Sequence, residues 1–187
     1  MNRRREAAWS LAAGALVALA ALAPVAAQAQ VRASDQQVKA AMLYNFAKFV
    51  DWPAAALGAP GTAVVFGVAG PPSFARVVEE TLRERALQGR GVTVRSVASL
   101  AEMRACHVVI FENVEESRWA AAIDGLRKSP VLTVGSAPEF ARRGGMIGFI
   151  AVDSKINFEI NNASARQAGL TISSKLLRLA SWTGGRE

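Results

Sequence analysis

The chain has 187 residues, of which 51% are hydrophobic, and a formal net charge of +7. This length suits one domain of ordinary size. The basic residues are scattered among acidic ones instead of forming a run interleaved with aromatic residues, so the sequence disfavours nucleic-acid binding. Because Cys106 is the only cysteine, no internal disulfide can form.

The first 29 residues have the pattern of a signal peptide. Arginines at positions 3–5 precede an uncharged Ala/Leu-rich run over residues 11–23, and Ala27-Gln28-Ala29 fits a small-x-small cleavage site. We therefore expect cleavage after Ala29, an exported chain, and one domain over residues 30–187. The alternative, an uncleaved membrane anchor, is disfavoured because Pro24 interrupts the apolar run.

Residues 35–51 are predicted to form an aromatic-rich helix. Ser34 and Gln37 make a capping box at its start, and Pro53 ends it. At about 100° per residue its large apolar side chains share one arc, which favours packing on a sheet over a membrane surface or partner groove. The predicted core stripe comprises Val38, Met42, Leu43, Phe46, Phe49 and Val50.

The middle of the chain alternates apolar strands with helices. This pattern predicts a mostly parallel sheet with helices on both faces. The expected strands are residues 62–70, 92–97, 106–112 and 131–135; the expected helices are residues 73–87 (capped by Ser73), 100–104 and 114–128.

After Gly144-Gly145 the pattern changes to a hairpin. Strands over residues 146–152 and 155–160 are separated only by Asp153-Ser154, and the second alternates as a half-buried edge strand would. Asn162 is expected to cap a long final helix through residue 180. The predicted fold is a single three-layer α/β domain with a mostly parallel sheet and a C-terminal antiparallel hairpin strand. Helices from both ends of the chain cap it.

Catalysis finds no support in the sequence. His107 and Cys106 are neighbours in a predicted strand, so their side chains should face opposite ways instead of forming a nucleophile–base pair. Pro71 and Pro72 remove backbone N–H groups from the one turn that resembles a phosphate loop. The His, Cys, Asp and Glu residues show no metal-ligand spacing. We expect no enzyme activity, no cofactor and no metal.

The residues best suited to binding form two groups. Lys48, Asp51 and Trp52 lie at the end of the first helix, and Glu159 and Asn161 lie on the polar face of the hairpin strand. Charged and amide groups beside an aromatic side chain are typical of a recognition site. The alternative is that they are ordinary solvated side chains.

Several segments together resemble the YfiR-like family of bacterial periplasmic proteins. They are "VKAAMLYNFAKFVDWP", "ACHVVIF", "GGMIGF" with "INFEIN", and "AGLTISSKLLRLA", which stand in family order across the mature chain. The resemblance implies an exported, often dimeric α/β domain without enzyme activity. It would bind the periplasmic segment of an inner-membrane signalling protein, a diguanylate cyclase, and repress it, so that cyclic-di-GMP signalling and biofilm formation come under its control. An outer-membrane, peptidoglycan-associated protein would relieve the repression.

Two points qualify the resemblance. Redox-sensitive family members place a second cysteine about where this chain has Gly67, so disulfide control does not transfer and Cys106 is interpreted as a small buried residue. Family likeness also does not fix the partner. An alternative function is therefore a periplasmic small-molecule sensor subunit for another membrane receptor, with a pocket near Lys48, Trp52, Glu159 and Asn161.

Overall fold

The computed structural model describes residues 23–153 and 155–185. Backbone contacts divide the chain between Gln36 and Gln37, and the fold below is that of the second unit. In chain order its elements are α2 (Ala23–Lys48, which begins in the first unit), β1 (Val50–Asp51), the 3-10 helix η1 (Ala54–Ala56), β2 (Val64–Ala69), α3 (Pro72–Leu82), β3 (Ala86–Leu87), β4 (Arg90–Ser96), α4 (Leu100–Arg104), β5 (Val108–Phe111), α5 (Glu116–Leu126), β6 (Leu132–Gly135), β7 (Ile147–Val152), β8 (Lys155–Asn161), α6 (Asn162–Gln167), β9 (Thr171–Ile172), α7 (Ser174–Leu179) and β10 (Trp182–Gly184).

One large sheet organises the domain. Its strand order is β10-β8-β7-β6-β5-β2-β4-β3, and β1 and β9 form a separate antiparallel pair. The central pairs β4–β2, β2–β5, β5–β6 and β6–β7 are parallel, whereas β7 and β8 form the expected antiparallel hairpin. The predicted mixed α/β fold with a mostly parallel sheet is confirmed.

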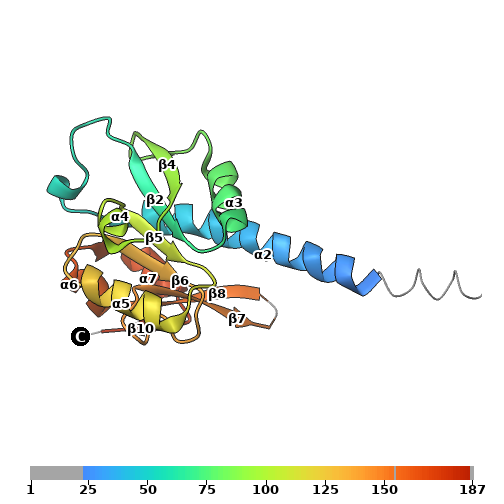
Figure 1. The fold of residues 1–187 in the computed structure, drawn as a ribbon. Coiled ribbons are helices and arrows are strands. Elements are labelled where there is room, and N and C mark those ends of the chain that lie inside the picture. Colours follow the sequence, from blue (N-terminus) through green and yellow to red (C-terminus); the bar gives the residue numbers. More distant parts are fainter. Residues whose placement is uncertain (1–22, 154, 186–187) are drawn as a thin grey trace, which may run out of the picture. The chain divides into compact units, whose positions relative to one another are not determined.

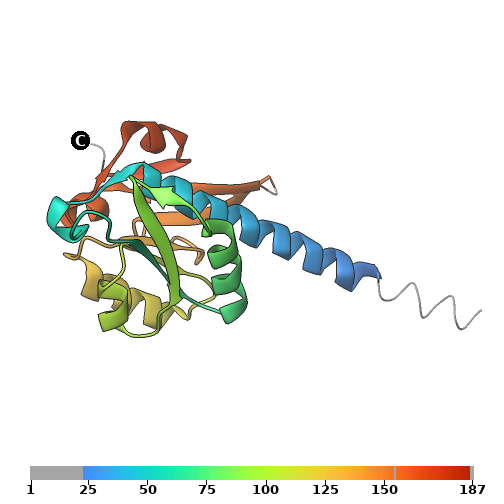
Figure 2. The same cartoon turned by 90° about the horizontal axis from the view of Figure 1, so that it is seen from above.

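Two cores lie on opposite faces of this sheet (Figures 1 and 2). The larger packs α2, α3 and the C-terminal helices on one face, and the smaller packs α4 and α5 on the other. Strand β5 supplies both, because alternate side chains of a strand point to opposite faces. Val108 and Ile110 enter the larger core, and Val109 and Phe111 the smaller.

The first helix differs from its prediction at both its start and its buried face. It is already helical at Ala23, upstream of the predicted cap at Ser34, and ends at Lys48. Alanine has the highest helix propensity, so the alanine-rich residues 23–33 need no cap at Ser34. The buried stripe includes Ala40 and Ala47, whose small side chains let the helix lie close to the sheet, whereas Val38 is 43% exposed.

The predicted long final helix over residues 162–180 is wrong. Gly169 adopts a left-handed φ of +80° and ends α6, after which β9 pairs with β1 before α7 begins. Asn161, not Asn162, caps α6. In one continuous helix Ala165, Ala168, Ile172, Leu176 and Leu179 would share an apolar face; the first four are buried, whereas Leu179 is 67% exposed.

Two further predictions need correction. The helix expected over residues 73–87 begins after Pro71 and ends at Leu82, because Glu84 takes a left-handed φ of +61° and the chain turns into β3. Strand β8 is not an edge strand, since β10 pairs with it in parallel, Trp182 opposite Glu159 and Gly184 opposite Asn161. Sequence periodicity gave no sign of so short a covering strand.

Candidate functional site

Lys48 and Asp51 lie at the exposed end of α2. The Lys48 ammonium stands over the Tyr44 ring at 5.7 Å from its centroid, and the Arg85 guanidinium stands over the same ring at 5.4 Å. The Tyr44 hydroxyl donates to the backbone oxygen of Ala86, 2.8 Å away, and so ties the helix to β3. Tyr44, Lys48, Asp51 and Arg85 are named here the helix-end surface; it presents two cations and one carboxylate to solvent.

Trp52, the third residue of this predicted group, is buried instead. It is 7% exposed, packs in the larger core, and its Nε1 has no hydrogen-bond partner among the described protein atoms. Its ring meets His107 edge-on with centroids 6.4 Å apart. Its indole therefore contributes packing area and little accessible surface.

His107 is held by the backbone on both sides of its ring. Nδ1 accepts from the Val65 N–H at 3.0 Å, and Nε2 lies 3.2 Å from the Ala56 oxygen, to which it donates in the neutral form. Burial lowers the pKa of His107, and the charge of Arg90 lowers it further, against the Ala56 hydrogen bond, which raises it. A neutral ring with both nitrogens occupied has a structural role.

Glu159, from the second predicted group, is buried and ion-paired. The Arg142 guanidinium donates to both of its carboxylate oxygens, with Nη2 2.7 Å from Oε1 and Nε 3.1 Å from Oε2. The same guanidinium stacks 4.6 Å from the centroid of the Trp182 ring. The hydrogen bond to Glu159 raises the pKa of Arg142. Planar stacking and bidentate pairing together suit Arg and not Lys.

Asn161 caps α6 and bridges to the next loop. Its Oδ1 accepts from the Ser164 N–H at 3.0 Å, and its Nδ2 donates to the Ala141 oxygen at 2.9 Å. The two predicted groups do not meet, because Phe158 of β8 contacts Phe46 of α2, and Glu159, next along the strand, therefore faces the other side of the sheet. The expected shared pocket near Lys48, Trp52, Glu159 and Asn161 is not formed.

A polar cluster that sequence reasoning missed lies at the carboxyl edge of the parallel strands. Glu112 follows β5 and Ser136 follows β6, and the Ser136 hydroxyl donates to Glu112 Oε2. Lys39 of α2 reaches the same carboxylate, with Nζ 2.8 Å from Oε1. The available signal was that Glu112 ends one predicted strand and Ser136 directly follows another. The carboxyl ends of parallel strands meet at one edge of a sheet.

A cleft opens beside this cluster. Its volume is about 380 Å³, within the range of small-molecule sites. It is lined by the segment after β5, by Trp119 of α5 and by the segment after β6: Phe111, Asn113, Val114, Glu115, Trp119, Ser136, Ala137 and Pro138. These residues are named here the carboxyl-edge cleft.

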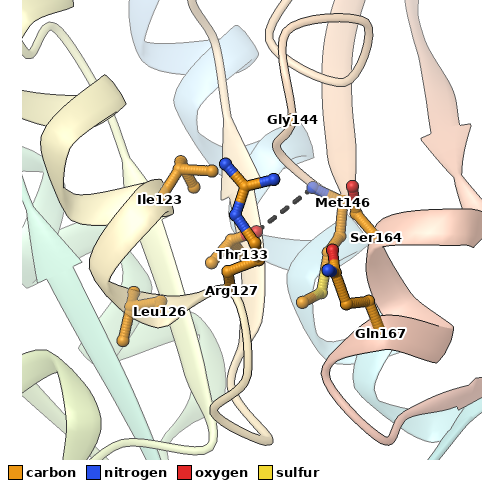
Figure 3. A pocket seen from close by; sticks show the side chains of 8 residues that line it. All are labelled: Ile123, Leu126, Arg127, Thr133, Gly144, Met146, Ser164 and Gln167. Carbon is orange, nitrogen blue, oxygen red and sulfur yellow. Dashed lines mark hydrogen bonds between the residues drawn. The ribbon is translucent and has the colours of Figure 1, made fainter.

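A second cavity, between α5, β6 and α6, is much smaller (Figure 3). It measures about 20 Å³, which suffices for a single water molecule. Ile123 and Leu126 line one side, and Ser164 and Gln167 the other, around a hydrogen bond from the Met146 N–H to the Thr133 hydroxyl oxygen at 3.1 Å. This space is too small for a metabolite.

Cys106 is buried beside Gly67, the position at which related proteins were expected to carry a second cysteine. A Cβ built on Gly67 would lie 2.8 Å from the Cys106 Sγ, so the two positions are neighbours across the sheet. Burial raises the pKa of the Cys106 thiol, although a hydrogen bond from Arg95 opposes the effect. The thiol donates to the Glu102 oxygen at 3.3 Å.

Residues 23–153 and 155–185 contain no cluster of three or more His, Cys, Asp or Glu that could hold a metal ion. Within the same part of the chain, no helix combines the length and apolar character needed to cross a bilayer.

Comparison with solved structures gives matches of low identity. An ABC domain in complex with L-Trp from Streptococcus pneumoniae is 13% identical with a TM-score of 0.49, covering 77% of this chain and 60% of that one. A conserved domain protein from Vibrio cholerae is 15% identical with a TM-score of 0.45, covering 66% and 55%. This chain thus spans less than two thirds of either structure. No curated protein sequence matches it.

The fold is that of a single α/β domain whose buried glutamates are ion-paired within it. Its family is shown by sequence: the chain belongs to the YfiR/HmsC-like family, whose model matches residues 36–181. This confirms the resemblance stated above. The family is periplasmic, and its members are regulators rather than catalysts.

Proposed function

We propose that this chain is an exported regulator that binds the periplasmic segment of an inner-membrane diguanylate cyclase and represses it. The observation that carries the proposal is the family match over residues 36–181. Repression by binding needs only that the regulator has higher affinity for the inactive arrangement of its receptor. An outer-membrane, peptidoglycan-associated protein would compete for the regulator and release the cyclase, and a homodimer of the chain would match a dimeric receptor.

We assign the contact with the receptor to the helix-end surface. Lys48 and Arg85 share the Tyr44 ring without an ion-pair partner among the described residues. Two neighbouring cations repel each other, and a carboxylate from a partner placed between them would relieve that repulsion. Lys48 and Asp51 remain in this proposal as binding residues, whereas the contacts of Trp52, Glu159 and Asn161 lie within the domain.

The test combines gene deletion with charge reversal. Deleting the gene should raise cellular cyclic-di-GMP, and the wild-type chain should restore the lower level. Lys48→Glu should restore it poorly, and Arg118→Glu, on exposed α5, should restore it fully. An unchanged cyclic-di-GMP level after deletion would refute the cyclase as receptor.

A crosslinking experiment tests the helix-end surface independently of the identity of the receptor. A photoreactive amino acid at position 48 should crosslink to an inner-membrane protein with a periplasmic segment, and the same amino acid at position 118 should not. Equal crosslinking from both positions would refute the helix-end surface as the receptor contact. The regulatory role would then be tested by the deletion experiment alone.

The alternative function is a small-molecule sensor subunit for another receptor. The observation in its favour is the carboxyl-edge cleft, whose volume of about 380 Å³ suits a small ligand. This replaces the predicted pocket near Lys48 and Glu159, which the fold does not form.

A further inference from the structure

The carboxyl-edge cleft lies where open α/β sheets bind ligands. From β2 the chain passes to β4 on one side and then returns to β5 on the other, so the strand order reverses between β2 and β5. Ligands of such sheets bind outside the carboxyl ends of the strands, near this reversal. Glu112 stands at that point, with its N–H donating to the Ala69 oxygen at 2.9 Å, and the cleft opens directly beside it.

Ser136 is held in one orientation by this cluster. Its hydroxyl proton is donated to Glu112 Oε2, and the other oxygen of that carboxylate is held by Lys39. A hydroxyl has one proton and two lone pairs, so the Ser136 oxygen is left as an acceptor toward the cleft it lines. A ligand group that meets Ser136 must therefore be a hydrogen-bond donor.

The one charged residue of the cleft lining has the same preference, and the nearby Arg143, which stands over the Trp119 ring at 5.4 Å, is paired with Glu116. Glu115 is an exposed residue of the lining, and no Lys or Arg is among the lining residues. The neighbouring Glu116 is engaged by Arg143, and Glu112 by Lys39, so Glu115 provides the carboxylate available to a ligand. Asn113, which also lines the cleft, has an amide oxygen that can accept a hydrogen bond.

The remaining lining is apolar. Trp119 and Phe111 are almost fully buried, whereas Val114 and Ala137 are half-buried and Pro138 is exposed, so these last three offer the accessible apolar surface. An acceptor set beside an apolar wall fits a cation attached to a hydrocarbon body.

We propose that the carboxyl-edge cleft binds a small primary amine, with its ammonium group between Ser136 and Glu115 and its apolar body against Val114, Ala137 and Pro138. The N-terminus of α5 also borders the cleft, and a helix N-terminus favours anions. A carboxylate ligand is therefore the competing outcome. The site does not depend on the proposed receptor, so binding to the purified chain can fail while the cyclic-di-GMP result stands.

Calorimetry with three ligands of equal length tests the proposal. The full chain is expressed with its own leader, purified in its exported form and titrated with n-hexylamine, n-hexanol and hexanoate. We expect saturable binding of the amine alone. Ser136→Ala should raise the Kd for n-hexylamine about tenfold, because it removes a hydrogen bond to a charged group. Glu115→Gln should raise it about threefold, as expected for an exposed ion pair.

The matched control is Glu116→Gln, which removes the same charge one residue away, outside the cleft lining. Its Kd for n-hexylamine should stay within about twofold of wild type, which excludes a general charge effect. Binding of hexanoate in place of the amine overturns the proposal. So does an absence of saturable amine binding, or a Kd that the two cleft substitutions leave unchanged.

Discussion

The molecule buries two glutamates in different surroundings. Glu112 is paired with Lys39, and their side chains are 11% and 17% exposed. Glu159 is equally buried, with a side chain 10% exposed, but its partner Arg142 is 45% exposed. One pair is thus enclosed on both sides, and the other has a buried carboxylate covered by a cation at the surface.

The difference shows how the two charges are stabilised. Lys39 belongs to α2, 73 residues before Glu112, so this pair ties the first helix to the carboxyl edge of the sheet. Arg142 lies 17 residues before Glu159, and its position is fixed by hydrogen bonds to both oxygens of that carboxylate and by stacking on Trp182. We expect the first pair to depend on charge balance and the second on the shape of the guanidinium.

The largest effect is expected from Lys39→Met. It leaves the Glu112 carboxylate buried without a cation and should lower the free energy of unfolding by about 3 kcal/mol, measured by urea denaturation. The double variant Lys39→Met/Glu112→Leu removes both charges and should recover most of this loss. If the single and double variants were equally unstable, the loss would come from packing of the lysine stem rather than from an unpaired charge.

A smaller effect is expected from Arg142→Lys, which keeps the charge but loses the bidentate bond and the stack on Trp182. Because the guanidinium is partly solvated, the free energy of unfolding should fall by clearly less than it does for Lys39→Met in the same assay. Arg118→Lys, at an exposed position of α5, is the control and should change nothing measurable. A loss as large as that of Lys39→Met would remove the distinction between the two pairs.

The sequence predicted the elements that depend on local pattern. The apolar strand before Glu112 and the hairpin of β7 and β8 were recognisable because periodicity and turn residues are local properties. The long C-terminal helix was wrong because the pattern of Ala165, Ala168, Ile172 and Leu176 fits a helix whether or not it is interrupted. The left-handed conformation of Gly169 ends the helix there.

The candidate sites were less accessible to sequence reasoning. Lys39, Glu112 and Ser136 are brought together by strand order and by the placement of α2, and neither is a local property. Glu159 was recognised as polar but placed on an open edge, because the three-residue β10 that covers β8 has no periodic signal. Whether Lys48 and Asp51 bind a partner stays a prediction.

A third glutamate separates the effect of hydrogen bonds from that of burial. Glu102 is solvent-exposed, yet its carboxylate accepts from the N–H groups of Ala98 and Ser99 and from the Ser99 hydroxyl. These bonds lower the pKa of Glu102 from 4.5 to about 2. The unfolded chain then binds more protons than the folded one between these values, so this stabilisation is complete above pH 4.5 and is lost as the pH falls toward 2.

Glu102→Gln tests this directly, because glutamine also fits the third position of a capping box but cannot ionise. The difference in the free energy of unfolding between wild type and Glu102→Gln should be constant above pH 4.5 and shrink as the pH is lowered. Urea titrations at several pH values measure it, and Glu80→Gln, on the exposed side of α3, is the matched control. A difference that did not vary with pH would mean that the cap acts through hydrogen-bond geometry alone, and charge would then matter only for the two buried glutamates.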